Sequence, residues 1–547
     1  MISELARGVL TFGIGWAIFK SLKRVFWRSP LDNLPGPPGG SFLAGHFNRV
    51  FTVDAWDYHK HLAMTYGSVV KLRGVFGAKA LFVYDPKALH HIFIKDQHIF
   101  DKTEGFAIAA GLVWGEGLFA TSGEQHRKQG KMLSSVFSGA RMRNMVPTFY
   151  DVTHKLRDTF LAKVSTSPKE IDVLDWMSRT TLELIGQSNL GYTFESLAED
   201  SKEHTYTREL KKFPDIYAQL TPAREYVLPW VYNIGTPAFR RWVVDHIPWK
   251  PLRELRDIAD VMKATSNDII GPKQRAMQEG NEAVADQVRG GDDFLNVLLR
   301  ENMKASGDDR LTDEELLGQV STLTHAAMDT TSSAVSRVLW LLSHNVDAQN
   351  KLREEIRQAH DMCGGDRLGY DELVSLPFLD AVCRETLRLH PPAPTTVRET
   401  REDVILPFSK PVRGIDGSEM YDVLVPKGTM VFPSFLSSNC DPDLWGPDSY
   451  EWKPERWIEG LPSSVTDAKL PGVDSHLMTF SGGKSACIGF KLAQLEMKVV
   501  LCVLLDKFKF APANGKEIEW KMAVLVTPAV VGELGVTQLP LEVSLAD

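Results

Sequence analysis

The sequence has few cysteines, and nothing in their arrangement suggests a cross-linked framework. The 547 residues include five cysteines, at positions 363, 383, 440, 487 and 502. Their number is odd and no CxxC pair occurs, which argues against a disulfide framework and against a zinc ribbon. The chain also lacks any Asn-x-Ser/Thr acceptor for N-glycosylation. Both absences favour a main body that faces a reducing compartment such as the cytosol.

A strong excess of positive charge is also absent. Lysine and arginine total 62 against 70 acidic residues, for a net charge of −8, so nucleic acid is not an expected partner. No low-complexity tract or internal repeat occurs, and the 43% hydrophobic and 24% charged composition excludes wholesale disorder and a polytopic membrane protein. At about 150 residues per domain, length alone predicts three or four domains.

Only the first thirty residues carry an uncharged apolar run at a terminus. Residues 8–19 are uncharged, and four basic residues follow by position 28. As a helix this run rises about 18 Å, or about 27 Å when extended back to Ile2, against roughly 30 Å of hydrocarbon. We predict that residues 1–29 form an uncleaved membrane anchor whose basic flank holds the following domain in the cytoplasm. The alternatives are an amphipathic interfacial helix and a retained signal sequence. Residues 30–40 are rich in proline and predict a stiff hinge.

Helical periodicity dominates the rest of the chain. Apolar residues spaced by three and four predict helices over residues 151–160, 175–190, 252–277, 347–360 and 490–505. Short β-like runs are expected over residues 68–73, 80–84, 422–425 and 429–432 and at the C-terminus. The predicted fold class is therefore mainly α with a minor β part.

The most informative predicted helix covers residues 313–343. Thr312 and Glu315 make a capping box at its start, and Asp329 is the only ionised residue between Glu315 and Arg337. Eight of those 21 residues are Ser or Thr, which favours the middle of a large soluble domain over lipid. Small residues at 326–327 let a ligand approach the helix, and an acid beside the hydroxyl of Thr330 can pass protons into that space. The alternative is a buried helix whose Asp and Thr satisfy local hydrogen bonds.

A second helix, over residues 377–390, places a carboxylate on its apolar stripe. Phe378, Val382 and Leu389 define the stripe, and Glu385 falls on it. A carboxylate that faces a core must be paired, and Arg388 at i+3 can reach it. An ExxR pair arises by chance about once or twice in such a chain, so the interpretation rests on the position of Glu385 on the apolar stripe. We predict a structural role.

The sharpest motif is FxxGxxxCxG at residues 480–489, which arises by chance in roughly one such chain in a thousand. Gly482 and Gly483 are expected to let backbone approach a flat ligand, and Gly489 to allow a tight start to the next helix. Cys487 precedes that helix, whose N–H groups favour a thiolate, and a thiolate is a strong axial ligand for haem iron. The alternative is a buried structural cysteine.

With these motifs in this order, the chain resembles the cytochrome P450 family from the hinge to the C-terminus. The landmarks are the proline-rich hinge, AAMDTT at 326–331, ExxR at 385–388, PPAPTTVR at 391–398, PERW at 454–457 and the cysteine loop. The chain looks most like the membrane-anchored type of basidiomycete fungi. The resemblance implies a single catalytic domain over residues 41–547 with the cytochrome P450 fold. Haem b would be buried between the long distal helix and the cysteine loop.

The resemblance also implies roles for individual residues. Cys487 would be the axial ligand of the haem iron, and Asp329 and Thr330 would deliver protons on the distal side. The remaining cofactor-binding residues would be Phe480, Gly483, Gly489, His126 and Arg398, the last at a haem propionate. A salt-bridged support behind the haem would consist of Glu385, Arg388 and Arg456.

Two positions depart from the family pattern. Ser485 stands where the family carries an arginine two residues before the cysteine, and His126 and Gly130 stand in place of the WxxxR pair. Two of three expected propionate-binding arginines are therefore missing, which should loosen cofactor retention. The side chains expected to compensate as point charges are His126, Arg127, Lys131 and Lys484. The departures keep open a weakly active enzyme or a non-catalytic haem- or sterol-binding protein.

The resemblance implies a lipophilic substrate, such as a terpenoid, a steroid or a polycyclic aromatic. The expected pocket residues are Phe106, Trp114, His325, Ala326, Thr396 and Val397. These stretches are apolar and aromatic, although His325 could equally be a core histidine.

No strand followed by GxGxxG occurs, so electrons from NADPH are expected through a separate cytochrome P450 reductase, with cytochrome b5 as a further candidate partner. The expected location is the endoplasmic reticulum membrane, with the catalytic domain on the cytoplasmic side. A haem-thiolate isomerase or peroxygenase is the other alternative, against which the Asp329–Thr330 pair argues.

Overall fold

The structure is a computed structural model that describes residues 29–547 except 135, 136, 138, 199, 200, 279–292, 475, 523, 534 and 547. Helices dominate and strands are few and short, so the predicted fold class is confirmed. The chain forms two compact units, which are described separately. We call them the N-terminal unit (up to Thr103, with 395–446 and 464–485) and the helical unit (104–394, 447–463 and 486–547).

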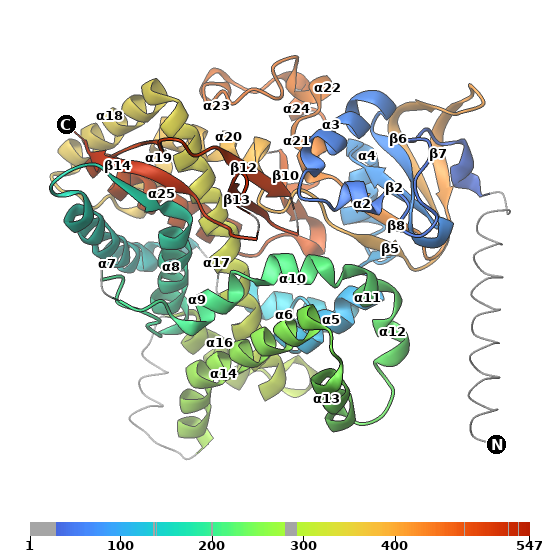
Figure 1. Ribbon diagram of the computed structural model, residues 1–547, viewed down its shortest axis with the longest axis horizontal. Coiled ribbons are helices and arrows are strands. Elements are labelled where there is room, and N and C mark those ends of the chain that lie inside the picture. The colour runs from blue at the N-terminus through green and yellow to red at the C-terminus, as the bar shows by residue number, and fades with distance from the viewer. Residues whose placement is uncertain are drawn as a thin grey trace. The chain divides into compact units, whose positions relative to one another are not determined.

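The N-terminal unit is built on a five-stranded sheet of order β1-β2-β8-β5-β3 (Figure 1). Its strands are β1 (Val69–Arg73), β2 (Lys79–Val83), β8 (Met430–Pro433), β5 (Arg398–Thr400) and β3 (Phe100–Asp101). Only β2 and β8 run parallel, and the other pairs are antiparallel. Two antiparallel pairs join it, β6 (Val404–Arg413) with β7 (Glu419–Val425) and β9 (Gly472–Asp474) with β10 (Leu477–Gly482). The sheet is buried because its strands carry near-continuous apolar runs such as ALFV in β2.

Short helices complete the N-terminal unit. They are η1 (Pro30–Asn33), α2 (Phe47–Val50), α3 (Ala55–Tyr66), η2 (Val75–Gly77), α4 (Pro86–His90), η3 (His91–Lys95), α21 (Phe435–Asn439), α22 (Pro442–Trp445), α24 (Ser463–Thr466) and η6 (Gly483–Ser485).

The helical unit is organised around α17, which packs against α8, α14, α20 and α25 (Figure 1). Its helices are α5 (Glu104–Trp114), α6 (Gly123–Ser134), α7 (Gly139–Val164), α8 (Val173–Ile185), η4 (Gly186–Leu190), α9 (Thr205–Leu210), α10 (Phe213–Gln219), α11 (Thr221–Tyr226), α12 (Leu228–Val231), α13 (Pro237–His246), α14 (Lys250–Gln278), α16 (Phe294–Lys304), η5 (Gly307–Asp309), α17 (Asp313–His344), α18 (Val346–Cys363), α19 (Tyr370–Ser375), α20 (Pro377–Leu389), α23 (Arg456–Glu459) and α25 (Phe490–Lys507). Its strands form a sheet of order β11-β14-β4 (Phe508–Pro512, Pro540–Leu545, Lys169–Asp172) and the pair β12 (Ile518–Met522) with β13 (Val526–Val530).

The predicted capping box is confirmed at the start of α17. The Thr312 hydroxyl accepts from the Glu315 N–H at 3.1 Å, and the Glu315 carboxylate accepts from the Thr312 N–H at 2.8 Å. The buried Glu315 also accepts bonds from Gln129 and Lys128 of α6. One carboxylate therefore begins α17 and fixes α6 against it.

The predicted anchor cannot be described, because residues 1–28 lie outside the described residues. Among the helices that are described, none is long and apolar enough to cross a membrane. The residues of the predicted hinge pack against the N-terminal unit. Leu31 and Leu34 are buried in its core, and the Lys71 N–H donates to the Pro35 carbonyl at 2.8 Å.

Candidate functional site

The cysteine loop runs from β10 through η6 to the start of α25. Gly483 has a φ of +62°, and a Cβ there would lie 1.8 Å from the carbonyl oxygen of Phe93. A Cβ at Gly482 would lie 2.0 Å from the carbonyl oxygen of Pro471. These glycines are therefore required by close approach of protein backbone. Their approach to a flat ligand stays a prediction.

Gly489 is different from these two glycines. Its φ of −92° is available to any residue, so a tight helix start does not explain it. A Cβ built there would meet no described atom within 4 Å. A side chain would therefore find open space at Gly489, two residues after the cysteine.

Cys487 is an exposed residue of the loop. Desolvation by the surrounding protein nevertheless raises the pKa of its thiol to about 11, and the backbone N–H of Gly489 opposes this only in part. The lowering by the Gly489 N–H agrees in direction with the sequence expectation for a cysteine before a helix, and desolvation outweighs it. A cationic partner such as iron would deprotonate the thiol, because a coordinating thiol loses its proton.

Asp329 and Thr330 lie at the middle of α17. The Thr330 hydroxyl donates to the Ala326 carbonyl at 2.8 Å, whereas Oδ2 of Asp329 is buried and has no hydrogen-bond partner among the described residues. Burial raises the pKa of Asp329 to about 7, although the positive charge of Lys211 opposes the change. A carboxyl group with this pKa exchanges its proton near neutral pH, as an acid–base residue must.

The surface of α17 opens at this point. Ala326, Ala327, Asp329 and Thr330 are partly accessible, whereas the residues from Thr331 to Leu339 are all buried. The two alanines are therefore accessible where a larger side chain would fill the space. This accessible stretch agrees with the expectation that a ligand approaches the helix here.

Glu385 is the centre of a buried ion-pair cluster. Arg388 binds it in a bidentate manner, with Nε and Nη2 each 2.8 Å from a carboxylate oxygen, and neither side chain is exposed. Nε of Arg456 lies 3.5 Å from Oε1 of Glu385, and its Nη1 donates to Asp448 at 3.0 Å. The structure thus brings together the three residues predicted as a structural support. Two charges buried this deeply require such dense pairing.

Sequence reasoning missed further members of this cluster. Trp457 Nε1 donates to Oε2 of Glu385 at 3.0 Å, and the backbone N–H of Lys453 donates to Oε1 at 3.0 Å. The carbonyl of Ser449 accepts from Arg388 at 2.6 Å. These groups tie the segment 449–457 to α20. The PERW motif offered the only signal, since it places a tryptophan beside Arg456.

Arg398 lies on β5 in the N-terminal unit, where it is 7% exposed. Its Nη1 donates to Thr396 Oγ1 and to the Val397 carbonyl, and burial lowers its pKa to about 10. Burial and the charge of Arg398 lower the pKa of Lys102 to about 8. The negative charge of Asp101 acts on both cations and opposes the lowering of each pKa. The binding of a haem propionate by Arg398 stays a prediction. Lys102 was not predicted from the sequence.

The side chains expected to compensate for missing arginines lie on the surface or near it. His126 lies half-buried on α6, and Lys131 and Lys484 are exposed. Arg127 is exposed and paired with Glu124 at 2.7 Å. A Cβ built at Gly130 meets only Leu118, at 4.0 Å, so a side chain fits at that position. Their compensating role stays a prediction.

The expected pocket residues divide between the two units. Phe106, Trp114, His325 and Ala326 belong to the helical unit, and Thr396 and Val397 to the N-terminal unit. Trp114 and His325 are in contact, with ring centroids 5.1 Å apart. Burial lowers the pKa of His325 to about 4, so its imidazole is neutral at physiological pH. Their contact with substrate stays a prediction.

Glu496 is a second buried acid that sequence reasoning missed. It lies on α25, nine residues after Cys487, with no exposed surface. Burial raises its pKa to about 8, and the nearby Thr331 hydroxyl opposes this slightly. The position of Glu496 among the apolar residues of the predicted helix was the sequence signal that could have identified it as a buried acid.

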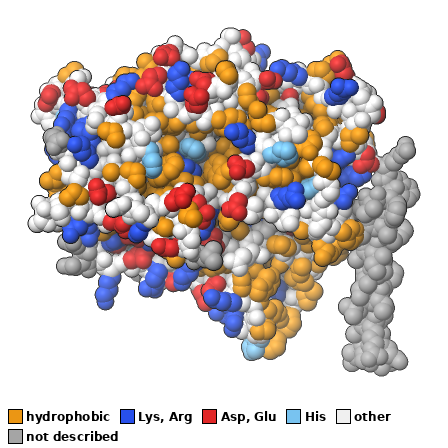
Figure 2. All heavy atoms as spheres, turned by 45° about the horizontal axis from the view of Figure 1, so that its top comes forward, with side chains coloured by type: hydrophobic (Ala, Val, Ile, Leu, Met, Phe, Trp, Pro, Cys, Tyr) orange, Lys and Arg blue, Asp and Glu red, His pale blue; other side chains and the backbone are white. Residues whose placement is uncertain are grey.

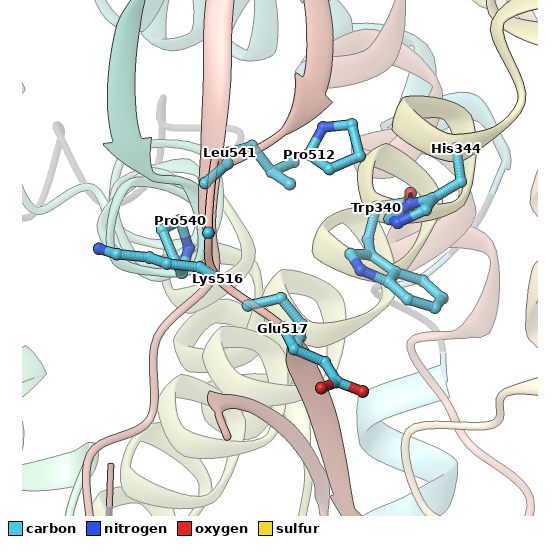
Figure 3. A pocket seen from close by; sticks show the side chains of 10 residues that line it. Trp340, His344, Pro512, Lys516, Glu517, Pro540 and Leu541 are labelled. Atoms are coloured by element: carbon cyan, nitrogen blue, oxygen red, sulfur yellow. Dashed lines mark hydrogen bonds between the residues drawn. The ribbon is translucent and has the colours of Figure 1, made fainter. Parts of the chain in front are cut away.

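A pocket of about 560 Å³ lies elsewhere in the helical unit, at the C-terminal end of α17 (Figure 3). Trp340 and His344 line it together with Lys516, Glu517, Pro540 and Leu541. None of the predicted site residues lines this pocket, and Lys516 is already paired with Glu170 at 2.5 Å. The lining residues therefore do not connect this pocket with the chemistry of Cys487 or Asp329.

Comparison with known proteins agrees with the family resemblance that the order of the motifs indicated. The family model described as cytochrome P450 matches residues 35–534. Cytochrome P450 monooxygenase 91 of Postia placenta is 47% identical over 99% of this chain and 98% of its own length. Ganoderic acid synthetase CYP5150L8 of Ganoderma lucidum is 42% identical, with 94% of each chain covered. A cytochrome P450 monooxygenase of Hericium erinaceus is 36% identical over 95% of this chain and 94% of its own. The family model covers most of the chain, including the cysteine loop, and the relatives align over nearly all of it, so the chain belongs to the cytochrome P450 family as a monooxygenase of the basidiomycete type.

Proposed function

We propose that this monooxygenase inserts one oxygen atom from O2 into a lipophilic small molecule, with electrons supplied by NADPH through a separate reductase. One oxygen atom enters a C–H bond of the substrate, and the other leaves as water with two electrons and two protons. The observation that carries the proposal is Asp329, which lies beside Thr330 on the accessible stretch of α17 and has a pKa of about 7 because most of its surface is desolvated.

Membership of the family implies a haem cofactor, and the residues present fit one. In the helical unit, Cys487 is an exposed residue and a Cβ at Gly489 would meet no described atom within 4 Å; in the N-terminal unit, Arg398 is a desolvated cation. We propose that Cys487 holds the iron and that Arg398 binds a propionate. When bound, thiolate-ligated haem supplies the activation of dioxygen.

The chain's own contribution to the reaction is the control of protons. Asp329 holds a proton on a carboxyl group that no described residue hydrogen-bonds at Oδ2, so the proton can be passed on without breaking a protein contact. The Thr330 hydroxyl, which donates to Ala326, can accept a bond from an adjacent donor. Only 14% of the Asp329 side chain is exposed and its Oδ2 is buried, which limits its contact with bulk water.

A lipophilic substrate is supported by the character of the side chains around α17. Trp114, Phe213 and Tyr217 are buried within van der Waals reach of His325 or of each other. Aromatic and apolar walls with a few polar groups suit terpenoids, steroids and polycyclic aromatics. One relative is named for the synthesis of ganoderic acid, an organic acid by its name.

We propose that the protein works at the endoplasmic reticulum membrane, with its catalytic part in the cytoplasm and with cytochrome P450 reductase, and cytochrome b5 as a second donor, as partners. An exposed apolar surface on α12, α13 and their flanks supports contact with lipid: Val227, Trp230, Val231, Ile234, Phe239, Trp242 and Trp249. Figure 2 shows hydrophobic side chains gathered at the lower edge of the view. Tryptophans beside basic residues such as Arg240 are typical of a membrane interface.

The test is product formation by the full chain with a fungal reductase in microsomes. A panel of terpenoids, steroids and polycyclic aromatics is incubated with NADPH and with 18O-labelled O2. The expected result is a hydroxylated product that carries one labelled oxygen and requires both NADPH and reductase. A product that forms without reductase, or with oxygen from water, would contradict the proposal.

A further inference from the structure

The pocket at the C-terminal end of α17 has the size of a small-molecule site. Its volume of about 560 Å³ lies within the range of about 300–1,000 Å³ that such sites occupy. Trp340 and His344 of α17 form one wall, and residues 512–518 with the start of β14 form the others (Figure 3). We call it the α17 pocket.

The walls of the α17 pocket are fixed by strand pairing and ring packing. Pro512 of β11 is paired with Leu541 of β14, and the Trp340 ring lies 5.8 Å from the Trp520 ring at an angle of 69°. The apolar part of the lining consists of Pro512, Ala513, Ile518, Pro540 and Leu541. The pocket is therefore preformed, and the apolar body of a ligand can lie against this wall.

The lining includes two charged side chains, of which one is already paired. Nζ of Lys516 donates to Glu170 at 2.5 Å, and Figure 3 shows the Lys516 side chain extending away from Trp340. Glu517 is exposed, and no described residue pairs with its carboxylate. The charge that the lining leaves for a ligand is therefore negative.

The charges around the pocket have the same sign. The pKa of Lys516 is raised, first by its hydrogen bond to Glu170 and then by the negative charges of Glu170, Glu533 and Asp172. Three carboxylates thus act on one ammonium group. A second anion would be repelled here, whereas a cation would be attracted.

The uncharged groups of the lining also favour a cation. Nδ1 of His344 lies 2.9 Å from the Trp340 carbonyl oxygen, which can only accept, so in the neutral ring Nε2 is an acceptor. The face of the Trp340 ring attracts positive charge. The buried Arg337 lies 5.3 Å from the Trp340 ring but 3.5 Å from that of Trp520, and it does not line the pocket.

We propose that the α17 pocket binds a small lipophilic ammonium ion, with the positive head against Trp340 and Glu517 and the body against the apolar wall. A carboxylate and an indole face together select a cation over a neutral molecule of the same shape. The pocket uses neither Cys487 nor Asp329. The proposal therefore goes beyond the proposed function and does not rest on it.

Equilibrium dialysis of the haem-loaded full chain at pH 8 tests the proposal. The probes are benzyltrimethylammonium and its uncharged isostere neopentylbenzene. The quaternary nitrogen has no lone pair, so the ammonium probe cannot ligate the haem iron. The wild type should bind one benzyltrimethylammonium ion per chain, more weakly at high salt because salt screens the Glu517 carboxylate. The absence of saturable binding, or an affinity that salt does not change, overturns the proposal.

Variants assign the binding to the pocket. Glu517→Gln changes an exposed side chain and should weaken the ammonium probe about three- to fivefold, while neopentylbenzene changes by less than about 1.5-fold. Trp340→Leu should weaken the ammonium probe by a similar factor. Glu519→Gln is the matched control, since it removes the same charge from a side chain that does not line the pocket. Equal effects of Glu517→Gln and Glu519→Gln, or no effect of Glu517→Gln, overturn the proposal.

The wild-type protein gives a second measurement that no folding defect affects. A benzyltrimethylammonium ion that carries a trifluoromethyl diazirine on its ring is photolysed with the full chain, and mass spectrometry maps the label. The label should lie within residues 340–344 or 512–518, and excess benzyltrimethylammonium should suppress it. Label confined to other segments overturns the proposal. Neither measurement requires turnover, so its outcome is independent of product formation.

Discussion

Replacement of Asp329 by asparagine tests the proton site most sharply. The change removes one ionisable group and keeps its size, in the middle of α17. In the folded protein burial raises the pKa of Asp329 from 3.8 to about 7. That difference corresponds to about 4 kcal/mol between the protonated and ionised forms. We expect the wild type to bear this cost when Asp329 ionises and the Asp329→Asn variant to be free of it.

The sign follows from proton binding. Between pH 3.8 and about 7 the folded state holds more protons at this site than the unfolded state, so stability falls as the pH rises through that window and is constant above it. Asp329→Asn should therefore match the wild type at pH 4 and exceed its stability by up to about 4 kcal/mol at pH 8. Glu496 affects both proteins equally and cancels in the difference.

The direct assay is an infrared pH titration of the full chain. The carboxylic C=O band of Asp329 should disappear with a midpoint near pH 7 and be absent from Asp329→Asn. Glu496→Gln is the matched control, since it should remove a different band with a midpoint near pH 8. Turnover of Asp329→Asn should fall by about 10²–10⁴ with substrate affinity unchanged. An Asp329 that is already ionised at pH 5 would refute the reasoning.

Three further predictions concern the support, the cofactor and the membrane. Glu385→Gln leaves Arg388 buried without its countercharge and should cost about 3–5 kcal/mol of stability in thermal unfolding, and a loss below about 1 kcal/mol would contradict the structural role. Gly130→Arg with Ser485→Arg restores the arginines of the family pattern and should slow haem transfer to apomyoglobin about tenfold. The reason is that an arginine binds a propionate in a bidentate manner and holds it better than a point charge does. An unchanged transfer rate would show that these two positions do not contact the propionates. Trp230→Phe with Trp242→Phe should reduce the quenching of tryptophan fluorescence by brominated lipid, and equal quenching in both proteins would place α12 and α13 outside the membrane.

Strong local patterns were sufficient to predict much of the fold. The helices expected at 347–360 and 490–505 are α18 and α25. α18 begins one residue earlier and ends three residues later than predicted, and α25 begins as predicted and ends two residues later. The capping box of α17 is present as predicted. The Glu385–Arg388 pair was predictable because an acid on an apolar stripe must be paired and i+3 is within reach. Local spacing carries that information without reference to the rest of the chain.

Long-range contacts were not predictable from one sequence. Gly482 and Gly483 are required by Pro471 and Phe93, and no local pattern shows that a segment nearly 400 residues earlier in the chain approaches the loop. The pKa of Cys487 depends on how much protein surrounds it, which outweighs the helix N-terminus. The short helices α9 to α13 carry no long periodic stretch, so their aromatic residues could be placed only by the structure.

The central claim is that Cys487 holds the haem iron, and the reduced, CO-bound difference spectrum of the full chain tests it most directly. The wild type should show the red-shifted Soret band typical of thiolate ligation. Cys487→Ser should lose that band, while replacement of the exposed Cys363 should leave it unchanged. A stable haem without the thiolate band in the wild type, or the same band in Cys487→Ser, would contradict the account.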